Sequence, residues 1–286
     1  MGILQHYPPR PLKLPAPYQP NPPLADPPLI ALVTPSFDQG RFLEATLRGV
    51  LDQRYPRLEY VVQDGGSADE TPELLAQYGP RLTHCASAPD RGQSHAINLG
   101  FAHTKGEIMA YLNSDDLLLP GALHSVAEYF AGHPEVDVVY GHRILIDAAD
   151  NELGRWVMPG HDDEVLSWAD YVPQETLFWR RRIWDRVGGA VDESFQFAMD
   201  WDLLLRFRDA GARFARLPRF LGAFRVHSLQ KTTGSMVDRG AEEMSRLRQR
   251  CHGRKVSLLE IRRAILPYLC RQAGCNWLYR LGLGSH

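Results

Sequence analysis

Short apolar runs alternate with segments of helical periodicity along the first half of the chain. Residues 29–33 and 108–112 are unbroken apolar runs, as is typical of strands buried on both faces of a parallel sheet. Residues 42–51 instead repeat their apolar side chains at helical spacing. The predicted strands span residues 29–33, 59–63, 83–86, 108–112 and 136–140, and the predicted helices span 42–51, 93–103 and 121–131, with another beginning at Thr71-Pro72. This alternation predicts an α/β fold with a mostly parallel, doubly wound sheet.

After residue 141 the pattern changes to short strands and isolated helices. A turn-forming stretch at residues 148–151 predicts a hairpin of residues 143–147 and 152–158. The other elements predicted here are a strand at 176–180, a helix at 200–208 and two short strands within 213–225, around Pro218. Because no linker separates the two halves, we assign residues 29–236 to a single domain.

Ten prolines lie within residues 1–28 and exclude a helix there. We interpret this proline-rich arm as a strap along the domain or a disordered leader, with a partner-binding motif as the less favoured reading. Residues 237–286 form a basic helical tail, with ten arginines and lysines against four acidic residues. Its apolar positions recur at helical spacing, so it either lies on an anionic membrane surface or packs on the domain with its charges in solvent.

The composition is that of an ordinary globular protein. The chain has 286 residues, of which 44% are hydrophobic and 23% charged, and a net charge of -2, which gives no indication of nucleic-acid binding. Its four cysteines fit no disulfide framework. We find no apolar run long enough to span a bilayer and no secretory signal, so we expect cytoplasmic residence, with peripheral attachment to the inner face of the plasma membrane left open.

Three of the predicted strands end in polar, turn-prone residues. These ends are Thr34-Pro35-Ser36, Asp64-Gly65-Gly66-Ser67 and Asn113-Ser114-Asp115-Asp116. Ligands of doubly wound sheets bind at the carboxyl ends of strands, so we expect the three segments to share one rim.

The pair Asp115-Asp116 is the most informative of these strand ends. Adjacent carboxylates after a strand can hold Mn²⁺ or Mg²⁺, and through the ion the phosphates of a nucleotide. A turn with a helix N-cap is the alternative reading, and the spacing does not say which aspartate binds directly.

Other polar residues are candidates for the same rim. Asp64 could accept from a nucleobase or ribose, and Arg91 could hold a diphosphate near a helix start. Taken in isolation, a plain Asp-Gly turn and a solvated arginine are the favoured readings of these two residues. Asp200, in the first turn of a helix, suits a general base. His227 is a candidate third metal ligand or phosphate contact, or a surface histidine.

Together these motifs resemble those of the family-2 glycosyltransferases, which have the GT-A nucleotide-sugar-binding fold. The resemblance covers residues 29–230. It rests on four ordered segments, namely residues 33–71, 90–116, 197–207 and 224–232. The nucleotidyltransferase alternative would require a glycine-rich loop and a lysine near the first strand, and neither follows residue 33.

Carried over by position, the resemblance implies a set of site residues. They are Thr34, Pro35 and Asp64 for the nucleoside, Arg91 for the diphosphate, Asp115 and Asp116 for the metal, with Asn113 at the first position of the metal motif, and Asp200 for the base. From the residues themselves we add Ser36 as a donor contact, His227 as a metal ligand, and Gln174, Glu175 and Trp201 as acceptor contacts. The implied reaction is an inverting, metal-dependent transfer from a nucleotide-diphosphate sugar to a hydroxyl of a glycan or lipid-linked acceptor, in surface polysaccharide synthesis. Gln174 and Glu175 can also be read simply as the start of a strand.

Three positions depart from the family pattern. Asn113 stands where the first carboxylate of the metal motif is usual, Met199 where a glutamate precedes the base, and Gln63 where a second aspartate is common. Asn113 and Met199 are the features that would suit a binding module without catalysis.

Overall fold

The protein is described from a computed structural model, which covers residues 4–14, 24–228 and 236–283. Its strands are β1 (Arg10–Pro11), β2 (Ile30–Ser36), β3 (Leu58–Asp64), β4 (His84–Ser87), β5 (Ile108–Tyr111), β6 (Leu117–Leu118), β7 (Val138–Asp147), β8 (Asn151–Trp156), β9 (Phe178–Arg180) and β10 (Phe214–Val226). Its helices are α1 (Gly40–Leu51), α2 (Thr71–Tyr78), α3 (Gln93–Ala102), α4 (Ala122–Gly132), α5 (Asp163–Trp168), α6 (Arg181–Arg186), α7 (Met199–Asp209), α8 (Met236–His252) and α9 (Leu258–Arg280), with short 3₁₀ turns η1 (Gly79–Arg81) and η2 (Gln174–Thr176).

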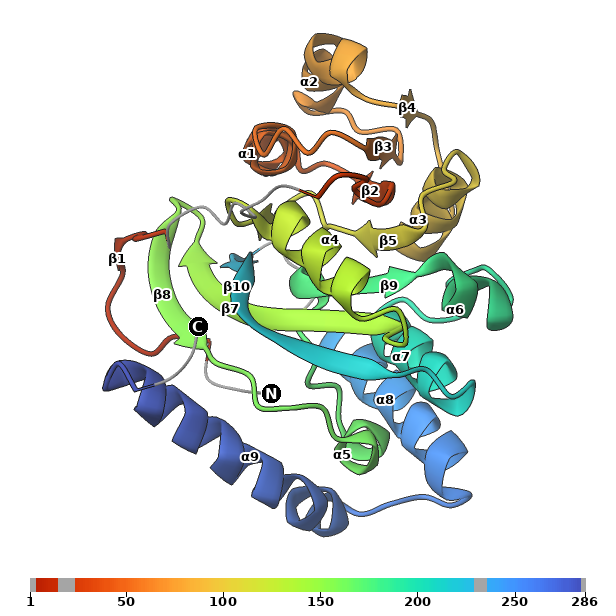
Figure 1. The fold of residues 1–286 in the computed structure, drawn as a ribbon. Helices are drawn as coiled ribbons and strands as arrows, with labels where there is room; N and C mark the ends of the chain where they lie inside the picture. Colours follow the sequence, from red (N-terminus) through yellow and green to blue (C-terminus); the bar gives the residue numbers. More distant parts are fainter. Residues whose placement is uncertain (1–3, 15–23, 229–235, 284–286) are drawn as a thin grey trace.

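The strands form one mixed sheet in the order β1-β8-β7-β9-β5-β2-β3-β4, and β10 pairs with both β7 and β6 (Figure 1). The strands β5, β2, β3 and β4 are parallel, as the alternating pattern predicted, whereas β9, β8 and β1 are antiparallel to their neighbours. The α/β class is therefore confirmed, and the parallel pairing is concentrated in the first half of the chain and in the β7–β10 pair.

Two predicted boundaries were wrong. The separate strands expected at 136–140 and 143–147 form one continuous strand, β7. The two strands expected around Pro218 form one strand, β10, whose register against β7 shifts between Arg216 and Gly222. Proline cannot donate a hydrogen bond to the ladder, so the pairing is interrupted locally and the chain then resumes the same direction.

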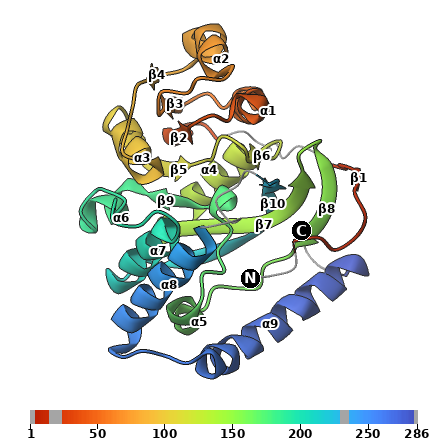
Figure 2. The same cartoon turned by 180° about the vertical axis from the view of Figure 1, so that it is seen from behind.

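Alternate residues of each central strand face opposite sides of the sheet. Ile30 and Leu32 of β2 pack in one core cluster with α1, α2 and α4, whereas Ala31 and Val33 pack in another with α3, α6 and α7. All four side chains are fully buried. Helices thus cover both faces of the sheet, which explains why the strand sequences are continuously apolar (Figure 2).

The two helices of the basic tail differ in how deeply they pack, since α8 contributes to the core and α9 lies on the surface. Leu247 of α8 is fully buried in the same core cluster as α7, so the predicted boundary at residue 237 falls inside a helix of the packed domain. α9 lies on the outside of the molecule, beneath α5 and β8 in the view of Figure 1. Among the described residues no helix combines the length and hydropathy needed to cross a bilayer.

The described part of the proline-rich arm forms a strap. β1 pairs with β8, and the buried carboxylate of Glu152 accepts hydrogen bonds from Tyr7, Arg10 and Arg155. Burial raises the pKa of Glu152, but these hydrogen bonds outweigh it and lower the pKa to about 2. Residues 4–14 therefore lie along β8 as a strap, and residues 15–23 lie outside the described part.

Candidate active site

The polar strand ends lie side by side at one edge of the sheet. Ser36 pairs in register with Asp64, and Asp64 with Ser87, so the last residues of β2, β3 and β4 are aligned. The amide of Leu112 donates to the carbonyl of Val33, which brings the segment after β5 to the same edge. We expected the polar residues to follow the strands, whereas β2 itself ends with residues 34–36 and β3 with Asp64.

Asp115 lies against His227, which is far away in the sequence. The distance from Asp115 Oδ2 to His227 Nε2 is 2.9 Å, and the His227 ring packs 4.7 Å from the ring of Phe42. The Asp115 side chain is 19% exposed, so one of its faces remains open at the rim. The structure therefore brings together two of the three residues predicted as metal ligands.

Asp116, the third predicted ligand, is turned inward. It is only 2% exposed, and its Oδ1 accepts from the backbone N–H of Arg225 at 2.9 Å, while Oδ2 lies 3.4 Å from the amide nitrogen of Asn113. Burial, reinforced by the neighbouring Asp115 carboxylate, raises the pKa of Asp116 well above its ordinary value. This placement ties the loop to β10 and leaves Asp115 as the carboxylate of the pair that is open at the rim.

Arg225 fixes the same loop from the opposite strand. Its side chain is almost fully buried, and it donates to the backbone carbonyls of Asp115 at 2.8 Å and Asp147 at 3.0 Å. It also pairs with Asp150 at 2.6 Å. One guanidinium thus connects the loop after β5 with the turn between β7 and β8.

Asn113 belongs to a chain of side-chain amides. Gln93 donates to Asn113 Oδ1 at 2.6 Å, and Asn113 Nδ2 donates to Gln174 Oε1 at 3.2 Å. Gln174 in turn donates to the carbonyl of Tyr111 at 2.8 Å. An aspartate at position 113 could not make the donor contacts, so the departure from the family pattern has a structural reason here.

Met199, the second departure, is explained by packing. It is 5% exposed, and its sulfur accepts a hydrogen bond from Ser94 Oγ at 2.9 Å. A glutamate in its place would bury a carboxylate next to the apolar core, which is costly without a charged partner. No comparable account follows for Gln63, which is buried within β3.

Asp64 organises its own turn. Its carboxylate accepts from the backbone N–H groups of Gly66 and Ser67 at 3.1 and 2.9 Å, and from the hydroxyls of Ser67 and Ser87 at 2.5 and 2.6 Å. The residue is fully buried. A nucleoside would therefore bind Asp64 directly only by displacing one of these hydrogen bonds, and the turn that Asp64 holds is the more accessible feature.

The three predicted donor residues of β2 are also buried. Thr34 is fully buried and shares a 3.0 Å hydrogen bond with the hydroxyl of Tyr60. Pro35 is buried next to it. The Ser36 hydroxyl is buried with no hydrogen-bond partner among the described residues, which leaves it able to bind a ligand at the strand end.

Arg91 is exposed and held by an acidic residue from a distant loop. Its guanidinium forms two hydrogen bonds to Glu193, at 3.0 and 3.1 Å, and Glu193 also contacts Asn98. The pairing places Arg91 between the start of α3 and the loop that precedes α7. A diphosphate would have to compete with Glu193 for this arginine.

Asp200 lies in the first turn of α7, as predicted. It is partly exposed, and its Oδ1 accepts from the backbone N–H of Trp201 at 2.8 Å. Desolvation and, as the next largest cause, the charge of Asp200 raise the pKa of the buried Tyr111 hydroxyl and the pKa of the Asp170 carboxyl. Asp170 is exposed by its surface area, which limits the effect of desolvation on its pKa, so the feature relevant to the site is the proximity of the Asp170 and Asp200 carboxylates.

Of the predicted acceptor residues, only Gln174 has its polar atoms in the network at the rim. Glu175 is buried and forms a two-pronged ion pair with Arg143, which holds η2 against β7. Trp201 is fully buried, and its indole N–H donates to the carbonyl of Leu166 at 2.8 Å. Direct acceptor contact by Trp201 does not agree with this position in the core.

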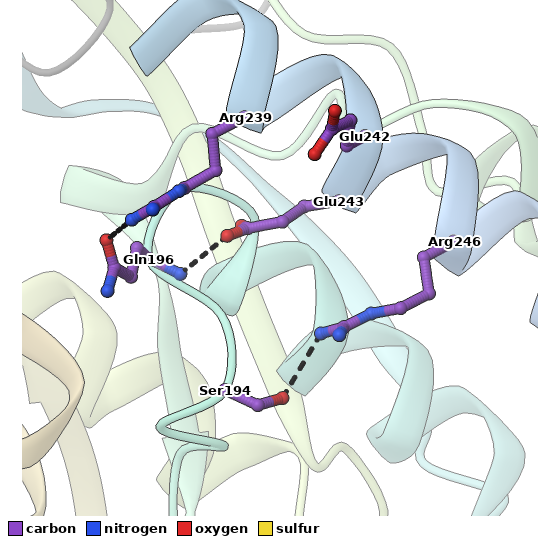
Figure 3. Close-up of a pocket in the computed structure, with 6 residues that line it drawn as sticks. All are labelled: Ser194, Gln196, Arg239, Glu242, Glu243 and Arg246. Carbon is purple, nitrogen blue, oxygen red and sulfur yellow. Dashed lines mark hydrogen bonds between the residues drawn. The ribbon is translucent and has the colours of Figure 1, made fainter. Parts of the chain in front are cut away.

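A hollow of about 420 Å³ lies between α8 and the loop that leads into α7 (Figure 3). Glu243 of α8 points into the loop and accepts from the backbone N–H groups of Gln196, Phe197 and Ala198, at 3.0, 2.9 and 2.9 Å. It is 8% exposed. The segment immediately before Asp200 is therefore held in place by a carboxylate from the tail.

Two residues at the rim carry groups of the kind that bind divalent cations. Within residues 4–14, 24–228 and 236–283, no three His, Cys, Asp or Glu side chains are grouped as a ready-made metal site. Mg²⁺ and Mn²⁺ are often held by one or two protein ligands, with substrate phosphates completing the shell. Asp115 and His227, in contact at 2.9 Å, are compatible with that arrangement.

The long-range partners of the site were not found from the sequence. They are Gln93, Arg143, Asp170, Glu193, Arg225 and Glu243. Gln93 and Arg225 lie within the motif segments 90–116 and 224–232, and that position was the one available signal for each. The other four lie outside the motif segments, and their roles depend on contacts with segments about 30 to 100 residues away in the sequence.

Solved glycosyltransferases have the same fold, which defines the chain as a member of the GT-A class. S. aureus TarS in complex with UDP-GlcNAc aligns with a TM-score of 0.62 and 15% identity, over 84% of this chain and 71% of that one. The mannosyltransferase PcManGT from Pyrobaculum calidifontis, in complex with GDP-Man and Mn²⁺, aligns with a TM-score of 0.61 and 19% identity, over 92% and 77%.

Within this class the chain belongs to glycosyl transferase family 2, whose model matches residues 31–190. The O-antigen biosynthesis protein RfbC of Myxococcus xanthus is 32% identical over 188 residues, which is 64% of this chain but 15% of that protein. An uncharacterized glycosyltransferase of Mycobacterium tuberculosis is 29% identical over 185 residues, covering 63% of this chain and 68% of the relative.

Proposed function

We propose that the protein is an inverting, metal-dependent glycosyltransferase that moves a sugar from a nucleotide-diphosphate donor to a hydroxyl group. The observation that carries the proposal is the 2.9 Å contact between Asp115 and His227 at the edge where β2, β3 and β4 end in register. It supplies a hard carboxylate oxygen, with an imidazole nitrogen beside it, at the place where doubly wound sheets bind their ligands.

Donor binding is proposed at the ends of β2 and β3. The turn that Asp64 holds presents backbone next to Ser36, whose buried hydroxyl has no partner in the described part of the chain. Arg91 is near enough to the start of α3 to contact a diphosphate once it leaves Glu193. Related folds bind UDP-GlcNAc and GDP-Man, which supports a nucleotide sugar as donor and leaves the base and sugar open.

Asp115, with His227, would hold Mn²⁺ or Mg²⁺, as the Mn²⁺ complex of the related mannosyltransferase supports. When bound, such an ion acts as a Lewis acid that stabilises the charge on the departing diphosphate. Asp116 and Arg225 fix the backbone of Asp115, so that its carboxylate is oriented before donor arrives.

Asp200 is proposed as the base that takes the proton from the acceptor hydroxyl. Its position at the start of α7 is fixed by the loop that Glu243 holds. A single carboxylate suffices for an inverting displacement, in which the hydroxyl attacks the anomeric carbon opposite the leaving group. Gln174 is the proposed acceptor contact. It accepts a hydrogen bond from Asn113, and the next residue, Glu175, is held by Arg143.

The acceptor class is proposed to be a glycan or a lipid-linked glycan of a surface polysaccharide. The name of the Myxococcus relative, an O-antigen biosynthesis protein, supports this assignment. Because the chain matches only 15% of that protein, the support is for the class of product and not for a particular linkage.

A donor screen followed by matched variants tests the proposal. Purified protein is heated with Mn²⁺ and a panel of UDP, GDP and dTDP sugars, and a marked rise in melting temperature identifies the donor. Release of nucleoside diphosphate and the anomeric configuration of the product are then measured.

Asp200→Asn should keep donor binding and lose at least about 100-fold in turnover. Asp209→Asn, an exposed aspartate of the same helix, serves as the matched control and should retain full turnover. Full activity of Asp200→Asn would refute the assignment of the base. Metal-dependent binding without turnover would favour a binding module, and release of pyrophosphate from nucleoside triphosphates would favour a nucleotidyltransferase.

A further inference from the structure

Exposed apolar side chains are concentrated on the outer face of α9. Eleven large hydrophobic residues are exposed in the described part of the chain, and eight of them lie between residues 258 and 283. Those eight are Leu258, Leu259, Leu266, Leu269, Trp277, Leu278, Leu281 and Leu283. Six of them belong to α9, and Leu281 and Leu283 follow directly after it. Isolated exposed leucines are common on protein surfaces, but such a cluster on and after one helix indicates a binding surface.

The opposite face of α9 is fixed to the domain. Tyr268 is buried, and Arg271 pairs with Asp162 at 2.5 Å. Asn276 accepts from the backbone N–H of Val157 at 3.0 Å, and Arg155 donates to the hydroxyl of Tyr279 at 2.6 Å. These contacts run along the helix and prevent it from rotating, so the apolar face is held outward.

Three of the exposed residues form a stripe along the helix axis. Leu259, Leu266 and Trp277 follow one another in steps that correspond to about two and three helical turns, so they lie nearly in line. Trp277 is 61% exposed and Leu259 57%. Tryptophan is enriched where proteins meet the boundary between lipid headgroups and acyl chains.

The charges beside the stripe are positive. Arg262, Arg263 and Arg280 are exposed, and α9 contains a single acidic residue, Glu260, which is already bound to Arg254 and to the capping residue Ser257. A second copy of the chain would bring arginines against arginines. An anionic lipid surface instead complements both the apolar stripe and the flanking cations.

We propose that the outer face of α9 docks on an anionic phospholipid bilayer, with Leu259, Leu266, Leu269 and Trp277 in the headgroup region and the arginines against lipid phosphates. The helix then lies in the plane of the membrane, in keeping with the finding that no described helix could cross one. This docking does not depend on the chemistry of the rim and is tested without measuring transfer.

Vesicle sedimentation of the full chain provides the test. Vesicles of phosphatidylcholine alone are compared with vesicles containing about one third phosphatidylglycerol. The protein should sediment with the anionic vesicles and dissociate from them as salt is raised, because exposed charges are screened at high ionic strength. Arg262→Gln/Arg263→Gln should weaken binding roughly fivefold for each arginine removed.

A triple variant, Leu259→Gln/Leu266→Gln/Trp277→Gln, should abolish sedimentation and keep the melting temperature, since all three side chains are exposed. Leu14→Gln/Leu99→Gln, which changes exposed leucines elsewhere, should bind as the unmodified chain does. The proposal is overturned if the triple variant still sediments, or if the unmodified chain ignores anionic vesicles. It is also overturned if the unmodified chain is a dimer and the triple variant a monomer, because the face then binds a second copy.

Discussion

Replacing Glu243 with glutamine tests whether the tail holds the loop that carries the base. The carboxylate accepts from three successive backbone N–H groups, at residues 196, 197 and 198. A glutamine keeps one oxygen, so at least one N–H faces the amide NH₂ and the other two lose a charged acceptor. An unpaired buried N–H costs about 1–3 kcal/mol and each of the two lost charge assistances about 1 kcal/mol, which gives at least about 3 kcal/mol in total.

Thermal unfolding and steady-state kinetics measure the two consequences. A loss of about 3 kcal/mol corresponds to a fall of about 6–9 °C in melting temperature for a domain of this size. Turnover should fall about 10- to 100-fold, with little change in donor binding, because Asp200 is displaced while the donor rim is intact.

Glu242→Gln is the matched control, since it removes the same charge from the adjacent, exposed position of α8. It should melt and turn over as the unmodified protein does. If Glu243→Gln and Glu242→Gln give the same melting temperature and the same turnover, the reasoning that links α8 to the base is wrong.

Three further perturbations test other parts of the structure. Asp115→Asn should remove the Mn²⁺-dependent stabilisation by nucleoside diphosphate, seen in melting curves, and leave the metal-free melting temperature unchanged. Asn113→Asp should destabilise the fold by about 1–3 kcal/mol in denaturant titrations, since it places a carboxylate beside Asp116 and removes two donors. Glu152, with its pKa lowered from 4.5 to about 2, should add stability that is complete above pH 4.5 and lost as pH falls toward 2. Because Arg10 is half exposed, solvent screening reduces this contribution to about 2 kcal/mol. The free energy of unfolding of Glu152→Gln should therefore fall less steeply between pH 4.5 and about 2 than that of the unmodified protein.

The strands and their common edge could be predicted because they depend on local patterns. Ile30 to Val33 is apolar without interruption, and the structure buries it on both faces of the sheet. Asp115 was identified because strand ends and carboxylates are both visible in the sequence. Its contact with His227 could be suspected only from the order of the family's motifs, since the two residues are 112 positions apart.

The orientation of polar side chains could not be predicted, because it depends on partners elsewhere in the chain. Asp115 and Asp116 are equivalent in the sequence, and the backbone N–H of Arg225 determines that Asp116 turns inward. Trp201 is next to Asp200 but on the core side of α7, which the motif alone does not reveal. Glu243 looks like any surface residue of a basic helix until the loop it holds is seen.

The buried guanidinium of Arg225 has a consequence for how the rim moves. It contacts the carbonyls of Asp115 and Asp147 and the carboxylate of Asp150, while its own backbone binds Asp116. The loop after β5 and the turn between β7 and β8 therefore cannot open independently. Their amide hydrogens should exchange with solvent in one cooperative step. A substitution that loosens the β7–β8 turn should therefore also speed amide exchange in the loop that carries Asp115.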